Sequence, residues 1–181
     1  MNPLTFVDIR DEAISQIKAA FAENKKLHIA AHPGQFDTAE IKRLANKTPA
    51  ILTSFMRYTE DDHSIDFANW VLYRADNNDR LYDGGLKIVS ALIPVIEDLD
   101  ADWSLGGGQR IEAECLYSGT LDQINITLWG VRWKWKIQEN FHHGYIPSDL
   151  EYFEGYDAAH NIGSAAVNDN VNLEVSNAST D

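Results

Sequence analysis

The sequence has little cysteine and few basic residues, and it contains no long hydrophobic run. Its 181 residues include one cysteine, Cys115, which excludes an internal disulfide framework and a cysteine-based zinc site. The longest apolar-rich stretch, residues 86–99, contains a lysine, a proline and two acids and is too short to span a bilayer. Residues 1–13 lack a basic segment followed by an apolar one, so we expect no signal peptide. These absences predict a soluble protein of a reducing cytoplasm.

Basic residues are also unevenly distributed along the chain. Fifteen Lys and Arg stand against 28 Asp and Glu, which gives a formal net charge of −13. No base follows Lys136, whereas eight acids do, so this last segment carries −8 and residues 1–136 carry −5. A protein that grips a nucleic-acid backbone needs clustered Lys and Arg, so the composition does not favour that class.

The chain nevertheless has enough apolar material for a folded core. Hydrophobic residues make up 44% of it and aromatic residues 10%. The length suits one domain with an extension. We predict that residues 1–137 form the domain and that residues 138–181 form an acidic, base-free extension or arm, which is aromatic in its first part.

Hydrophobic spacing predicts three helices. Thr5 and Asp8 have capping-box spacing, and apolar residues then recur at helical intervals up to Phe21. A second, shorter helix begins at Asp37 and must end before Pro49.

The third helix is expected after Gly85, and its wide apolar stripe predicts deep burial. Pro94 should kink this helix or divide it in two, and the glycines at 106–108 should form a flexible link.

The remaining periodic segments have the composition of strands. Residues 27–33 predict a short strand, and two antiparallel pairs are expected, one from 50–58 with 64–75 and one from 111–119 with 122–137. Apolar residues in the last strand change from even to odd positions at Trp129, which predicts a β-bulge that keeps them on one face. The sequence therefore predicts an α+β domain, with an antiparallel sheet of about four to five strands and helices packed mainly on one face.

Two groups of histidines are candidates for metal binding. His28 and His32 flank the first predicted strand, and the loop 60–63 offers carboxylates and an imidazole. His142 and His143 lie next to another acid, Glu139. Neither group has a short ligand spacing such as HExxH, so we interpret the first as a solvated loop and the second as exposed residues.

Two further features allow either a structural or a functional interpretation. Cys115 has no base beside it in the predicted strand, so a structural role is favoured over a nucleophile. The run from Trp133 to Lys136 alternates aromatic and basic residues, a pattern that resembles a surface for stacking nucleic-acid bases. Strand alternation places both tryptophans on one face and both lysines on the other, which indicates core or interface tryptophans. We therefore expect no catalytic site, metal or cofactor.

Several segments combine into a recognisable pattern. An initial helix DEAISQIKAAF is followed by HPGQFDTAEIKRLANKTPAILTSF, a Gly-Gly-led helix and LYSGTLDQINITLWGVRWKWKI. Together these segments resemble the Mu-like phage tail-terminator family over roughly residues 7–137. The Pro-Gly-x-Phe-Asp motif of that family matches Pro33, Gly34, Phe36 and Asp37, which we interpret as a turn and a helix cap.

The resemblance implies a structural, non-enzymatic virion protein, present in the host cytoplasm during assembly. Such proteins form a ring, usually of six copies, at the head-proximal end of a contractile tail, where they stop tube and sheath polymerisation and join the tail to the neck. The implied partners are further copies of the chain, the tube and sheath proteins and the neck proteins. DNA passes through the ring without sequence-specific binding, and no catalytic or cofactor-binding residue is implied.

A ring subunit needs interface residues, and the aromatic residues of this chain are candidates. We expect such contacts from the following residues: Trp129, Trp133, Trp135, Phe141, Tyr145, Tyr152, Phe153 and Tyr156. Two alternatives stay open. One is a head-completion or neck adaptor protein, and the other is a small metal-dependent hydrolase that uses His32, the loop 60–63 or His142 and His143.

Overall fold

The computed structural model describes residues 5–75, 78–116, 125–138, 155–162 and 165–172. The chain divides into two compact units, Met1–Gly144 and Tyr145–Asp181. The elements in chain order are α1 (Phe6–Ala20), β1 (His28–Ala31), α2 (Thr38–Ala45), β2 (Ala50–Thr59), β3 (Ser64–Arg74), α3 (Asn78–Glu97), β4 (Gln109–Cys115), β5 (Ile126–Lys136), β6 (Gly155–Ile162) and β7 (Ala165–Asn172).

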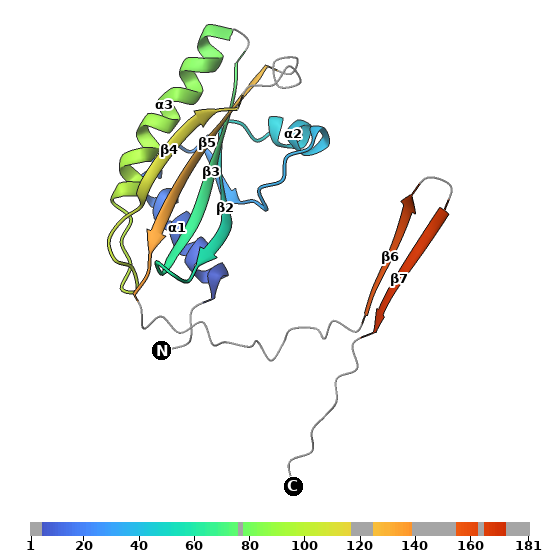
Figure 1. Ribbon diagram of the computed structural model, residues 1–181. Coiled ribbons are helices and arrows are strands. Elements are labelled where there is room, and N and C mark those ends of the chain that lie inside the picture. Colours follow the sequence, from blue (N-terminus) through green and yellow to red (C-terminus); the bar gives the residue numbers. More distant parts are fainter. Residues whose placement is uncertain (1–4, 76–77, 117–124, 139–154, 163–164, 173–181) are drawn as a thin grey trace. The chain divides into compact units, whose positions relative to one another are not determined.

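The first unit is built on a five-stranded sheet with the order β1-β2-β3-β5-β4 (Figure 1). The two predicted antiparallel pairs, β2 with β3 and β4 with β5, are confirmed, and β3 also pairs antiparallel with β5. β1 runs parallel to β2, so the sheet is mixed, and the predicted antiparallel arrangement holds for β2, β3, β5 and β4 but not for β1. The chain between β1 and β2 passes through α2, and this crossover returns it in the same direction. The α+β class is confirmed.

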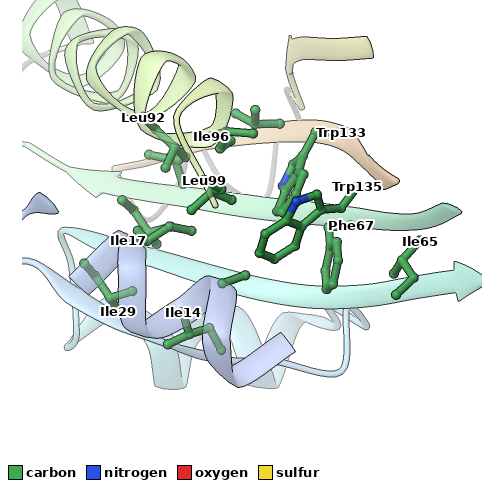
Figure 2. Packing of buried hydrophobic residues seen from close by; sticks show 14 of the residues in the cluster. Ile14, Ile17, Ile29, Ile65, Phe67, Leu92, Ile96, Leu99, Trp133 and Trp135 are labelled. Atoms are coloured by element: carbon green, nitrogen blue, oxygen red, sulfur yellow. The ribbon is translucent and has the colours of Figure 1, made fainter. Parts of the chain in front are cut away.

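Helices cover the two faces of the sheet unequally. α1 and α3 pack on one face, where a large apolar cluster joins them to β3 and β5 (Figures 1 and 2). α2 packs on the other face through Ile41 and Leu44, which belong to a smaller cluster with Leu52, Leu72 and Leu128. The prediction of helices mainly on one face therefore holds for α1 and α3, while α2 covers part of the opposite face.

β5 contains no bulge, although its sequence changes phase. Its register with β3 is unbroken from Arg74–Ile126 to Ser64–Lys136. Ile126 and Leu128 therefore face α2 and join the smaller cluster, whereas Trp133 faces α1 and α3. The predicted bulge at Trp129 is wrong because one end of this strand is buried on both faces. That end therefore needs apolar residues at odd and at even positions.

α3 begins before the two glycines that were expected to lead into it. The helix runs without a break from Asn78 through Pro94 to Glu97, so a division into two helices is not observed. Gly85 lies inside the helix, on the side that faces β5. A Cβ atom at Gly85 would lie 2.7 Å from Thr127 Cγ2 and 2.8 Å from Trp129 Nε1. Close helix–sheet packing therefore explains a glycine in a helix interior.

The glycines at 106–108 form a packed joint rather than the predicted flexible link. The Gly108 N–H donates to the Ile96 carbonyl at 2.8 Å, and the Gly106 carbonyl accepts from Trp135 Nε1 at 2.9 Å. A Cβ atom at Gly107 would lie 1.8 Å from the Glu97 carbonyl oxygen. This segment therefore needs residues without side chains to fasten the end of α3 to the sheet.

The second unit contains an antiparallel pair of strands, β6 and β7. Their register runs from Gly155–Asn172 to Ile162–Ala165. The sequence shows no clear periodicity here, and no strand was expected in the predicted extension.

Candidate functional site

The most developed polar cluster lies where β1 leads into α2. His32 follows β1, and its side chain is only 4% exposed. Its Nδ1 accepts the Gly34 N–H at 3.0 Å, and its Nε2 lies 3.0 Å from Glu40 Oε1. Because Nδ1 is an acceptor, the ring proton sits on Nε2, which donates to the carboxylate of Glu40.

Arg43 holds the same carboxylate from the next turn of α2. Its Nε donates to Glu40 Oε2 at 2.7 Å, and its Nη2 donates to Glu40 Oε1 at 2.5 Å. This fork, together with the hydrogen bond from His32, lowers the pKa of Glu40 from 4.5 to about 2. Glu40 is therefore an ionised acceptor at neutral pH. We call His32, Glu40 and Arg43 the clasp.

A tight turn brings His32 onto α2. Pro33 is exposed, and Gly34 has a φ of 87°, in the left-handed region that favours glycine. The Asp37 side chain then accepts the Glu40 N–H at 2.7 Å and caps α2. In the structure, these residues form a turn and a helix cap.

An aromatic ring holds the His32 side chain, and a hydroxyl group holds its backbone. Phe36 stacks on this ring with a centroid distance of 4.4 Å, and its edge meets Trp70 at 5.2 Å. Trp70 Nε1 donates to Ser54 Oγ at 2.9 Å, and Ser54 Oγ donates to the His32 carbonyl at 2.8 Å. The turn is therefore fixed to both α2 and the sheet.

The clasp borders an open depression of about 590 Å³. Among the described residues of the clasp, both ring nitrogens of His32 and both oxygens of Glu40 already have partners. The Ser54 hydroxyl is also engaged. The clasp therefore holds no free base or activated nucleophile, and its geometry suits a structural link between β1 and α2. Of the residues that the hydrolase alternative names, His32 is thus bonded through both ring nitrogens within its own chain.

The other candidate histidines do not join the clasp. His28 begins β1, at the opposite end of the strand from His32, and burial lowers its pKa, as do the charges of Lys47, Lys18 and Arg43. His142, His143 and Glu139 lie outside the described residues.

The loop 60–63 is engaged in bonds within the sheet. His63 has a φ of 44°, and its carbonyl accepts the Ile137 N–H at 2.8 Å. Asp62 accepts from the Ser64 hydroxyl and from Lys134 Nζ, and these bonds lower the pKa of Asp62. Within the part of the chain that the structure describes, no three His, Cys, Asp or Glu side chains gather to hold a metal ion.

The predicted interface tryptophans lie in the core of the first unit. Trp129, Trp133 and Trp135 are 6%, 2% and 0% exposed, and Trp133 Nε1 donates to the buried Asn69. The structure selects the core over the interface, so their side chains are covered by their own chain. Phe141, Tyr145, Tyr152 and Phe153 lie outside the described residues, and the backbone of Tyr156 belongs to β6.

Beyond α2, the same face of the sheet is open and charged. A depression of about 470 Å³ lies over β2, β3, β4 and β5. Three of its four lining bases are paired with acids on neighbouring strands or turns: Arg57 with Asp66, Arg132 with Glu114 at 2.8 Å, and Lys134 with Asp62 at 3.0 Å. The fourth, Arg110, forms no ion pair with another described residue. We call this surface the open face.

β4 forms one edge of the sheet, and most of its side chains are exposed. Its pairing with β5 shifts register between Gln109 and Glu112, where Arg110 has a φ of 50°. Cys115 ends the strand and is exposed, with Sγ 3.8 Å from Thr127 Oγ1. The cysteine is therefore an edge residue rather than a core residue.

Comparison with known proteins adds no family to these observations. No model of a known protein family matches the chain, and no curated protein matches it either. Within the described residues, no helix is long and apolar enough to cross a membrane. The function must therefore be inferred from the residues and their geometry.

Proposed function

We propose that the chain is a structural virion protein, a tail terminator that forms a ring at the head-proximal end of a contractile phage tail. In this role it stops polymerisation of the tube and sheath and joins the tail to the neck. The observation that carries the proposal is the order of the quoted segments, which resemble the Mu-like tail-terminator family. They fall on α1, on the turn and helix before β2, on α3, and on β5.

The architecture of the first unit is compatible with ring assembly. β1 and β4 leave two edges of the sheet without a neighbouring strand among the described residues. The open face presents charges next to an exposed methionine, Met56, which is 48% accessible. Val7 and Leu105 add further exposed apolar side chains at 54% and 53%. A ring offers neighbours that cover such edges and patches.

The clasp also supports a role in assembly. It uses a histidine, a carboxylate and a guanidinium to fix a loop onto a sheet, and these groups are already bonded to one another. Rigid placement of surface elements is what a repeating subunit needs, because small errors of angle accumulate around a ring.

Electron microscopy of particles assembled without this protein tests the proposed function. A missing terminator leaves tube and sheath growth unchecked, so we expect tails longer than those of the wild type. Finished tails of normal length that remain unattached to heads would instead indicate the neck adaptor. Normal tails joined to heads would reject both functions.

A further inference from the structure

One end of the domain is basic, although the chain as a whole is acidic. Residues 18–47 contain six of the 15 bases and only three acids. Lys18 lies near the end of α1, Lys25 and Lys26 lie in the turn before β1, and Lys47 follows α2. All four are exposed, and none of them forms an ion pair with another described residue. We call this region the basic end.

The basic end surrounds a depression of about 340 Å³ between α1 and β1. Lys18, Lys25 and His28 contribute its polar lining, and the half-buried Phe21 and Leu27 contribute an apolar part. Glu23 lies exposed in the same turn. The depression therefore combines an apolar surface with an excess of positive charge, which suits a ligand that is both acidic and apolar.

The positive charge of this region comes from elements that are distant in sequence. Burial lowers the pKa of His28, and the charges of Lys47, Lys18 and Arg43 lower it further. Arg43 is already held by Glu40, which leaves Lys18 and Lys47 as the uncompensated charges near His28.

The bases of the open face differ from those of the basic end in their ion-pair partners. The open face also contains several bases, but Arg57, Arg132 and Lys134 each pair with an acid of the same face or of the loop beside it. Three of its four lining bases are thus paired within the subunit, Arg110 being the exception, whereas the lysines of the basic end have no such partners among the described residues.

The chain itself contains a segment with the matching chemistry. Residues 149–157, DLEYFEGYD, place four acids and three aromatic residues in nine positions. They belong to the stretch after Lys136, which contains eight acids and no base. Such a segment can offer carboxylates to the lysines and aromatic rings to Phe21 and Leu27.

We propose that residues 149–157 of one copy bind the basic end of a neighbouring copy, at Lys18, Lys25 and His28. This inference rests on the ring subunit proposed above and names the contact between its copies. Each subunit then carries one donor segment and one acceptor depression. Such a head-to-tail contact closes into a ring when the rotation between neighbours permits it.

Cross-linking in a mixture of light and ¹⁵N-labelled full-length chains tests the contact directly. A zero-length carbodiimide reagent joins a lysine to a carboxylate only when the two groups touch. We expect links from Lys18 or Lys25 to carboxylates of 149–157, with light–heavy pairs among them. The absence of these links would overturn the proposal, as would links confined to pairs of the same label.

Charge reversal in the full-length chain provides the second test. Lys18→Glu with Lys25→Glu should weaken association about tenfold in sedimentation velocity, the scale expected for losing two exposed ion pairs. Glu151→Lys with Glu154→Lys should do the same, and the four substitutions together should restore association. Arg80→Glu with Lys87→Glu, on the exposed surface of α3, makes the same charge change elsewhere and should leave association unchanged.

The outcomes separate the contact from the proposed function. Rings that survive both reversals, or a combined variant that fails to recover, would overturn the contact while leaving the terminator function standing. Normal tail length without the protein would reject that function while leaving the cross-linked contact intact. If duplex DNA binding requires Lys18 and Lys25 and no cross-links to 149–157 form, the depression binds a phosphate backbone instead of the acidic segment.

Discussion

Glu40 shows how a single side chain can join a loop to a helix. It accepts hydrogen bonds from His32 and Arg43, and its own N–H is bonded to Asp37. His32 was a candidate residue in the sequence, but Glu40 and Arg43 were not. Their spacing of three residues on a helix is a common surface ion-pair spacing, so only the turn at Gly34 reveals that they meet a histidine.

Replacement of Glu40 gives a test of the clasp with a defined pH dependence. Its pKa is lowered from 4.5 to about 2, so its stabilisation is fully present above 4.5 and is lost as the pH falls toward 2. We expect Glu40→Gln to lower the urea midpoint at pH 7 and the difference from wild type to shrink as the pH falls below 4.5. The exposed Glu97→Gln is the control. A difference in urea midpoint between Glu40→Gln and wild type that does not change with pH would contradict the clasp.

Gly85 gives a test of packing at the same scale. Alanine usually stabilises a helix interior by ~1 kcal/mol relative to glycine. Here a Cβ atom would meet Thr127 and Trp129 within 3 Å, so Gly85→Ala should destabilise the domain by ~1–3 kcal/mol in urea unfolding. Ser90→Ala, on the exposed side of α3, should change stability by no more than ~0.5 kcal/mol. A stabilised Gly85→Ala variant would show that α3 does not pack so closely.

The elements that could be predicted are those that local chemistry specifies. Thr5 and Asp8 form the expected capping box, with the Thr5 N–H 2.7 Å from Asp8 Oδ2, and Asp37 caps α2 as its position suggests. The strand pairs followed from alternation and turn residues. The direction and the buried face of each strand did not all follow from the sequence, because the pairing of one strand depends on the rest of the sheet.

Two errors illustrate that limit. Four residues of β1 fit a parallel or an antiparallel neighbour equally well, and only the crossover through α2 decides between them. The change of phase in β5 predicts a bulge only for a strand with one buried face. The second apolar cluster around Leu128 could be recognised only once α2 was placed over it.

The first helix offers an element-scale prediction. Thr5 Oγ1 accepts the Asp8 N–H at 3.2 Å, and their mutual bonds lower the pKa of Asp8. Thr5→Ala should therefore cost ~1 kcal/mol of stability, measured by urea unfolding at pH 7. Ser15→Ala on the exposed side of α1 is the matched control. Equal stability of the two variants would contradict a functional cap.

At the scale of the whole molecule, charge is separated along the chain. The segment after Lys136 carries −8, while the basic end gathers lysines from α1, the following turn and the end of α2. The sequence revealed the acidic segment directly. It did not reveal the basic end, because Lys47 comes near His28 through the pairing of β1 with β2, and Lys18 does so through the packing of α1 beside β1.

Ring formation by the purified full-length chain is the most direct test of assembly as its function. Native mass spectrometry at low salt should show a closed oligomer, with six copies as the number that the family resemblance implies. The same oligomer should sediment together with isolated phage tails. A chain that remains monomeric at all concentrations and never sediments with tails would contradict the account.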